Sequence, residues 1–158
     1  MSRTIPARPG VVWDHLRDIP SHVRWMADAE AIRFVGDRRA GVGTTFDCDT
    51  KVGPIRLVDR MEVTEWAPGR AMGVRHVGVV TGSGRFSLRR SRLRRSTRLT
   101  WEEELRFPWW LGGPLGAVVG RQVLAAIWRG NLRRFEALVS PTGSRGARRR
   151  GRARRRAA

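Results

Sequence analysis

The spacing of apolar residues divides the chain into three parts. Near the N-terminus, apolar residues lie at helical spacing after Pro9, and Pro20 begins a second short helical pattern. From residue 29 the period changes to two, which is typical of strands, and after residue 107 it returns to that of a helix. The pattern predicts two short helices, then strands, then one long C-terminal helix.

The strand-like part holds six segments of alternating apolar and polar residues, bounded by Gly, Pro or charged residues. They are 31–35, 44–52, 55–66, 71–80, 84–90 and 97–107. Strands that follow one another and a single helix at the end favour an α+β domain with a curved antiparallel sheet. The 158 residues are enough for one substantial core, so we expect one domain at 1–140.

The apolar run at 107–128 is long enough to raise the question of a membrane span, because it holds only one charged residue, Arg121, in 22 positions. It also holds two Pro and four Gly, and its apolar stripe continues to Leu138 with Arg129 and Arg133 on the opposite face. We therefore predict a helix at about 114–139 that covers the sheet, rather than a membrane anchor.

Strand alternation also predicts which side chains face the core. It places Asp59, His76 and Glu103 on the same inner face as their apolar neighbours. A four-residue connection, WAPG at 66–69, would place Val63 opposite Met72 and Asp59 opposite His76. The hypothesis is that Asp59, His76 and Glu103 form the polar end of an apolar pocket. Its expected lining residues are Trp25, Met26, Phe46, Met61, Trp101 and Trp128.

Two interpretations of this polar group stay open. A histidine oriented by a carboxylate is suited to general-base chemistry on an acidic C–H or a hydroxyl, so His76 with Asp59 or Glu103 is a candidate catalytic group. Buried Asp and His residues also satisfy each other in purely structural roles. The three histidines and single cysteine show no metal-ligand spacing, and no glycine-rich phosphate loop precedes a helix, so no metal or cofactor is expected.

Charge is strongly biased toward arginine. The formal net charge is +18, and residues 141–158 carry eight Arg and no acidic residue. This segment lacks large apolar residues, so we expect a disordered tail. Together with the basic segment 89–95 it would suit an anionic membrane surface or nucleic acid, although a merely solubilising tail is an equal alternative. The lone Cys48 makes a reducing cytoplasm the default location, and the oligomeric state stays open.

Several short motifs, in this order and spacing, resemble the SRPBCC superfamily and, within it, the START-like polyketide cyclase/dehydrase-type proteins. They are VWDHLRD, PSHVRWM, GVGT, VTEWAPGR, TRLTWEEEL and NLRRFEAL, within residues 12–138. The resemblance extends over about residues 4–139 and implies a helix-grip fold: a sheet of six to seven strands around the long helix, with a cavity for lipids, polyketides or similar ligands. The family's first strand is reduced here to SRTI.

These observations predict a protein that binds a small hydrophobic ligand such as a lipid, polyketide or quinone-like molecule. The alternative is a cyclase or dehydratase that uses His76 with Asp59 or Glu103. A second alternative is a partner of RNA or the ribosome that acts through its Arg clusters, and a peripheral membrane location would also fit them.

Overall fold

A computed structural model describes residues 1–92, 95–108 and 113–140. Its elements, in chain order, are β1 (Ser2–Ile5), α1 (Pro9–Leu16), the 3-10 helix η1 (Ile19–Arg24), β2 (Ala29–Val35), β3 (Thr45–Val52), β4 (Ile55–Ala67), β5 (Ala71–Val77), β6 (Thr81–Arg90), β7 (Thr97–Arg106) and α2 (Gly113–Val139). The strands form one antiparallel sheet in the order β1-β7-β6-β5-β4-β3-β2. The predicted α+β helix-grip architecture is confirmed, and α2 begins within one residue of the predicted helix.

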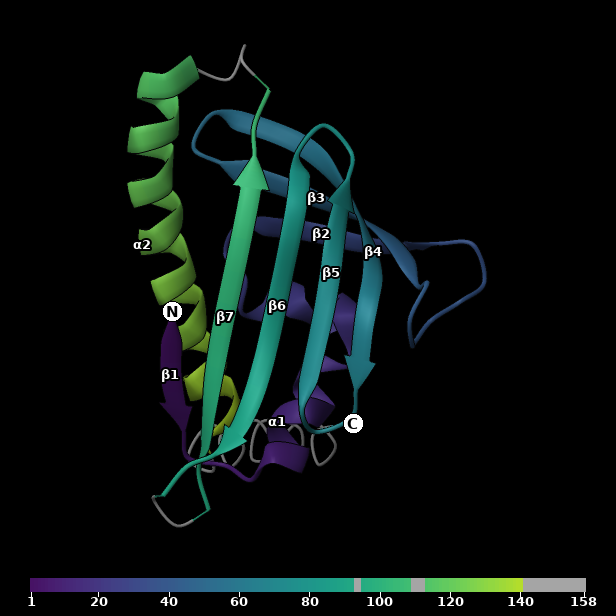
Figure 1. Cartoon of the computed structure of the whole chain (residues 1–158), viewed down its shortest axis with the longest axis vertical. Coiled ribbons are helices and arrows are strands. Elements are labelled where there is room, and N and C mark those ends of the chain that lie inside the picture. The colour runs from purple at the N-terminus through teal and green to yellow at the C-terminus, as the bar shows by residue number, and fades with distance from the viewer. Residues whose placement is uncertain (93–94, 109–112, 141–158) are drawn as a thin grey trace, which may run out of the picture.

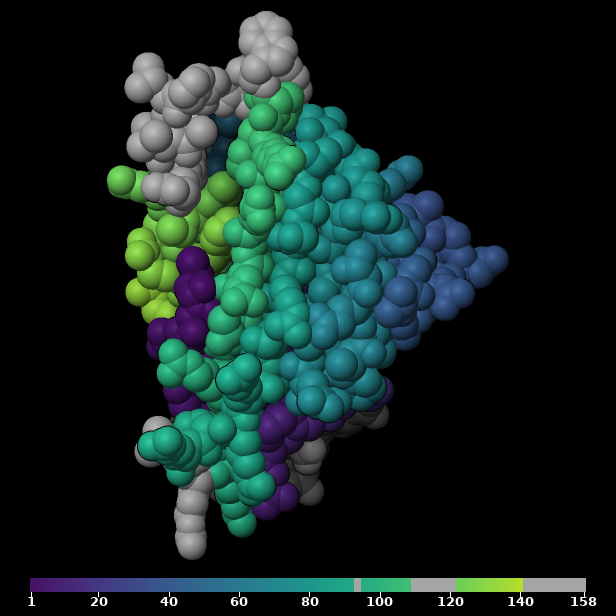
Figure 2. All heavy atoms as spheres, in the orientation of Figure 1, coloured from purple at the N-terminus to yellow at the C-terminus, as the bar shows by residue number. Residues whose placement is uncertain are grey.

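The sheet bends around the inside of the molecule. In Figure 1, β4 to β7 run side by side, β2 and β3 cross behind them, and α2 runs along the edge that β1 and β7 form. Figure 2 shows the outer surface of β4 to β7 filled with side chains, with the β2–β3 loop projecting at one side. The hollow of the sheet therefore faces α2 and the short helices.

The first strand is short but present. All four residues of β1 pair with β7, and the terminal amino group of Met1 donates to the Trp101 carbonyl oxygen at 2.6 Å. An ion pair between Arg3 and Glu136 then joins β1 to α2. These contacts cover the edge of β7, which would otherwise present unpaired backbone groups.

Aromatic residues form the core at the end of the sheet near α1 and η1. Trp25, only 1% exposed, has its ring 4.9 Å from that of Phe135 on α2 and 6.1 Å from that of Trp101 on β7. Asn131 on α2 is fully buried, and its amide accepts from the Ala27 backbone N–H at 2.9 Å. These contacts join α2 to the chain after η1 and hold it over the sheet.

The register of β4 and β5 differs from the predicted one by three residues between the turn and a bulge, and by two residues beyond the bulge. Val63 lies opposite Val74, not Met72, and His76 lies opposite Met61, not Asp59. β4 continues to Ala67, which shortens the turn, and a bulge between Val63 and Glu65 adds one residue on that side. A shift of two residues keeps every side chain on its face, so the predicted inner residues stay inside.

The sequence raised the possibility of a membrane-spanning helix within residues 107–128, most of which the structure describes as part of α2. Among the residues that the structure describes, no helix is long and apolar enough to cross a membrane. The arginine-rich segment 141–158 lies outside the described residues, so its expected disorder stays a prediction.

Candidate functional site

A cavity of about 810 Å³ lies between the inner face of the sheet and α2. Most of its lining is apolar, and every strand from β2 to β7 contributes residues to it. Three of the lining residues, Ile55, Phe107 and Val123, are between 42% and 45% exposed. These residues mark the open end of the cavity, whereas the aromatic core closes the opposite end. A volume of this size is typical of small-molecule sites.

Three ionisable side chains meet in the cavity wall and form what we call the carboxylate–imidazole array: Asp59 on β4, His76 on β5 and Glu103 on β7. His76 Nδ1 lies 2.7 Å from Asp59 Oδ2, and His76 Nε2 lies 2.9 Å from Glu103 Oε1. Each of the three side chains is at most 10% exposed. The array combines the three residues that the sequence predicted to share a face.

Both ring nitrogens of His76 face carboxylate oxygens, so both must donate a proton for the two contacts to be hydrogen bonds. Burial alone would lower the pKa of His76, but its hydrogen bonds to Asp59 and Glu103, together with the negative charges of these two carboxylates, outweigh burial and raise that pKa to about 9. His76 is therefore an imidazolium at neutral pH. In this state it has no free nitrogen to accept a proton. The expected catalytic role of His76 stays a prediction.

Glycines on β6 explain how Glu103 reaches His76 across an intervening strand. β6 lies between β5 and β7, and Gly84 is the inner-face residue opposite Glu103. A Cβ atom at Gly84 would lie 3.0 Å from Glu103 Oε1 and 3.1 Å from Oε2. The missing side chain leaves room for the carboxylate, whose Oε2 accepts from the Trp101 indole N–H.

One oxygen of the array has no protein partner. Asp59 Oδ1 is buried and, within the described part of the chain, makes no hydrogen bond. Asp59 lines the cavity and is 7% exposed. A buried carboxylate oxygen without a donor is costly, so this atom is a position where a bound molecule or water would add a hydrogen bond.

The array lies in the middle of the wall rather than at its end. Along β4, Asp59 stands between Leu57 and Met61, and along β7, Glu103 stands between Trp101 and Leu105. All of these side chains line the cavity. The expected polar end is therefore corrected to a polar patch with apolar wall on both sides.

Five of the six predicted lining residues are in the wall: Met26, Phe46, Met61, Trp101 and Trp128. The sixth, Trp25, is corrected to a core position beneath the cavity, because the aromatic rings around it separate it from the hollow. The rings of Trp101 and Trp128 lie 5.6 Å apart and bring β7 and α2 together at the cavity.

His22 and Asp28 are polar residues of the wall that were not predicted from the sequence. His22 donates from Nε2 to the Leu16 carbonyl at 2.8 Å, and burial lowers its pKa to about 4, so it is neutral. Asp28 accepts from the Asn131 amide at 2.7 Å. The helical spacing of His22, Trp25 and Met26 could have indicated that His22 shares a face with Met26.

Solved structures share this fold over most of the chain. The protein TTHA0849 from Thermus thermophilus is 18% identical, with a TM-score of 0.70 over 88% of this chain and 94% of that one. The Zhui aromatase/cyclase from Streptomyces sp. R1128 is 20% identical, with a TM-score of 0.63 over 90% and 95%. The di-domain ARO/CYC StfQ from the steffimycin biosynthetic pathway is 16% identical, with a TM-score of 0.69 over 88% of this chain and 49% of that one.

At these identities the structures support the fold alone, and no curated protein is similar enough to count as a relative. A family model supports more than the fold, because it matches residues 1–140, a range that includes every described residue. The chain belongs to the family described as polyketide cyclase / dehydrase and lipid transport.

Proposed function

We propose that this protein binds a small, mostly apolar molecule that carries a hydrogen-bond donor in the midst of its apolar surface. The observation that carries the proposal is the position of Asp59 Oδ1, buried and unpartnered in the wall of a cavity of about 810 Å³. Family membership supports a role in binding or cyclising such molecules.

The position of the array narrows the shape of the ligand. Apolar wall extends on both sides of Asp59 and Glu103, so a ligand that fills the cavity places apolar surface on both sides of its polar group. A fused-ring or multi-ring molecule with a hydroxyl on its flank meets this condition. A single-chain lipid with a terminal head group would place its polar end against apolar wall at one end or outside the cavity at the other.

Native mass spectrometry of protein purified from its own host tests the proposal. Met61 points into the cavity and the adjacent Glu62 points outward on the same strand. Met61→Trp therefore places a larger ring in the cavity beside His76, and Glu62→Trp is the matched control. We expect a bound small molecule in the wild type and in Glu62→Trp, and its loss in Met61→Trp. Equal retention by both variants would place the ligand outside the cavity and contradict the proposal.

The free oxygen of Asp59 also favours a second candidate function, acid–base chemistry on a ketone. Asp59 Oδ1 would take a proton from a carbon next to a carbonyl, and the C–H electron pair would move to form the enolate. His76 holds the other oxygen of Asp59 and fixes the orientation of the carboxylate. This is the first step of an aldol-type cyclisation, and it assigns the base to Asp59 instead of His76.

Deuterium exchange separates this candidate from binding alone. Incubation of a phenyl-substituted β-diketone with the protein in heavy water, followed by NMR, reports proton removal without the natural substrate. Catalysis would be supported by exchange that is faster than in buffer and is lost in Asp59→Asn. Asp47→Asn, which changes an outward carboxylate of β3, is the control and should keep the exchange. Exchange equal to buffer in the wild type would leave the binding function alone.

A further inference from the structure

The charged groups of the cavity interior are mostly negative, in a protein whose formal net charge is +18. Three carboxylates line it, those of Asp28, Asp59 and Glu103, against one imidazolium, that of His76. Two other titratable groups of the described wall, His22 and Cys48, are neutral, because burial lowers the pKa of His22 to about 4 and raises that of the Cys48 thiol to about 11.

Among the side chains that the structure describes, the cations near the cavity lie at its rim or behind its wall. Arg106 lines the open end, but its side chain is 80% exposed and lies 3.8 Å from Glu104. Arg134 donates to the Asn131 amide oxygen at 3.2 Å, on the side away from the amide nitrogen that Asp28 binds. Within the described residues, no ion pair joins Asp28 to a cation, and Asp59 and Glu103 share the single charge of His76.

We propose that the cavity selects its ligand by charge, taking neutral or cationic hydrogen-bond donors and rejecting carboxylates. This inference rests on the proposed binding function and goes beyond it, because it names the polar group of the ligand. A hydroxyl or an amine can donate to Asp59 Oδ1. A carboxylate at the same place would set acceptor against acceptor, and no protein donor in the array is free to compensate.

A closely matched set of probes tests the selectivity: diphenylmethanol, diphenylmethylamine and diphenylacetate. Each carries its polar group between two rings, as the middle position of the array requires, and they are neutral, cationic and anionic at neutral pH. Calorimetric titration of the full chain should show the alcohol and the amine binding at least about tenfold more tightly than the acid.

Asp59→Asn tests whether the array causes the preference. The variant keeps an oxygen for His76 Nδ1 and removes the negative charge. The ratio of the dissociation constants of diphenylacetate and diphenylmethylamine, which we call the affinity gap, should therefore shrink by about tenfold or more. Asp47→Asn, the same change on the outer face, should keep the wild-type order. Asp28→Asn should narrow the affinity gap to a smaller extent, and it repeats the test at a site that does not touch His76.

The outcomes separate the two proposals. Wild-type binding of diphenylacetate as tight as that of diphenylmethanol would overturn charge selection and leave a hydrophobic binding protein. An unchanged affinity gap in both Asp59→Asn and Asp28→Asn would show that these carboxylates do not set it, which also overturns the inference. No binding of any of the three probes would overturn both the selectivity and the proposed binding of donor-bearing ring compounds.

Discussion

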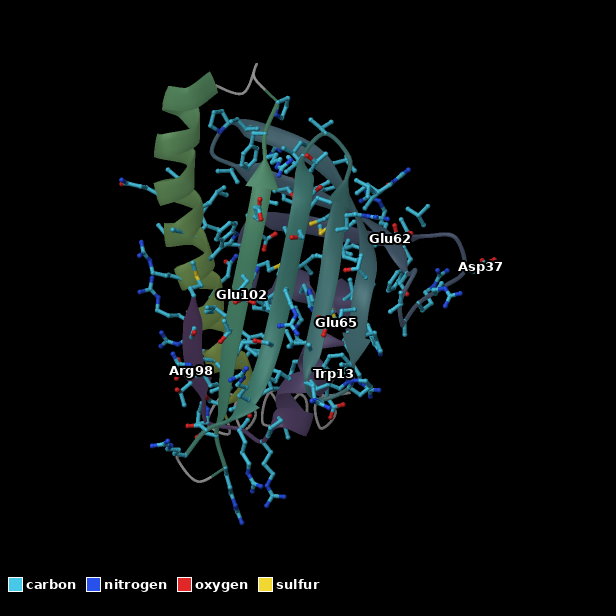
Figure 3. All side chains as sticks on the ribbon, viewed as in Figure 1. Trp13, Asp37, Glu62, Glu65, Arg98 and Glu102 are labelled. Carbon is cyan, nitrogen blue, oxygen red and sulfur yellow. The ribbon has the colours of Figure 1, made fainter. Side chains whose placement is uncertain are left out.

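The two faces of the sheet use the same chemical groups in opposite surroundings. On the outer face, carboxylates pair with arginines of other strands, as Asp47 with Arg60 of the neighbouring strand at 2.7 Å and Glu65 with Arg85 across β5 at 2.6 Å. Figure 3 shows Glu62, Glu65 and Glu102 on this side of β4 and β7. On the inner face, two carboxylates hold one imidazole in a cavity of apolar wall.

The contrast between the exposed ion pairs of the outer face and the buried array of the inner face indicates which charged residues serve function. Exposed ion pairs contribute little to folding, because water and salt screen them and long side chains lose freedom when they pair. A buried charged group costs several kcal/mol in lost hydration unless its partners are well placed, so burial of three such groups needs a compensating advantage. Here two carboxylates share a single cation, and one buried carboxylate oxygen, Asp59 Oδ1, has no hydrogen-bond donor among the described residues.

The largest expected effect comes from removing the centre of the array. His76→Leu leaves two buried carboxylates without their shared donor, and we expect about 3 kcal/mol or more of lost unfolding free energy in urea denaturation. Arg85→Leu, which breaks an outer pair, serves as the control and should cost several-fold less. Equal losses would mean that the inner array is no different from the surface pairs.

The next effect is a loss of stability at alkaline pH. The pKa of His76 is about 9 in the folded chain and 6.5 in an unfolded one, so its contribution is complete below pH 6.5 and disappears as the pH rises to 9. We expect a decrease on the order of 2 kcal/mol across this range in urea denaturation. Cys48 has an ordinary thiol pKa of 9.0 when unfolded, so it adds a further loss only above that pH. His76→Leu should abolish the decrease, and a wild-type stability that is flat from pH 6.5 to 9 would contradict the charge assigned to His76.

A smaller effect is expected at Gly84. In Gly84→Ala the new Cβ atom would press on the Glu103 carboxylate and move it away from His76, at a cost of about 1 kcal/mol. The pKa of His76 should fall in an NMR titration, because one of the two groups that raise it is displaced. Gly130→Ala on α2 is the control, because the new Cβ atom would lie 3.6 Å from Arg134 Nη1, its nearest neighbour. This variant should leave the pKa of His76 unchanged.

The smallest effect is expected from Glu65→Gln on the outer face. The Arg85 guanidinium lowers the pKa of Glu65, so the pair contributes above the ordinary pKa of a glutamate and is lost as the pH falls. At neutral pH the change in unfolding free energy should be close to the error of measurement and should vanish in high salt. A loss comparable to that of His76→Leu would contradict the distinction between the two faces.

The sequence predicts the faces of the strands well because alternation survives errors in register. The inward position of Asp59, His76 and Glu103 followed from parity alone, and the shift of two residues between β4 and β5 did not change it. Register itself depended on a bulge near Thr64 and on the length of the turn, and neither has a distinctive sequence signal here. The position of the array in the middle of the cavity wall could not be predicted for a similar reason. This position depends on which residues of each strand reach the cavity, and alternation does not show that.

The contact between Glu103 and His76 crosses an intervening strand, so reasoning from pairs of neighbouring strands does not predict it. Glu103 reaches His76 over β6, and only the absence of a side chain at Gly84 makes this possible. Inner-face glycines between two polar strands are a signal that could have indicated it. Trp25 was misplaced because its large apolar ring fits a core as well as a cavity wall, and only the rings around it decide between them.

The central claim is that His76 is held as a cation by both carboxylates and that Asp59 Oδ1 is left to meet the ligand. Nitrogen NMR of the His76 ring in the wild-type protein, with and without diphenylmethanol, tests it most directly. We expect two protonated ring nitrogens at neutral pH in both states, with a shift at Nδ1 when the alcohol binds to the carboxylate beyond it. A neutral ring that titrates near 6.5, or one that diphenylmethanol leaves unchanged at saturation, would contradict it.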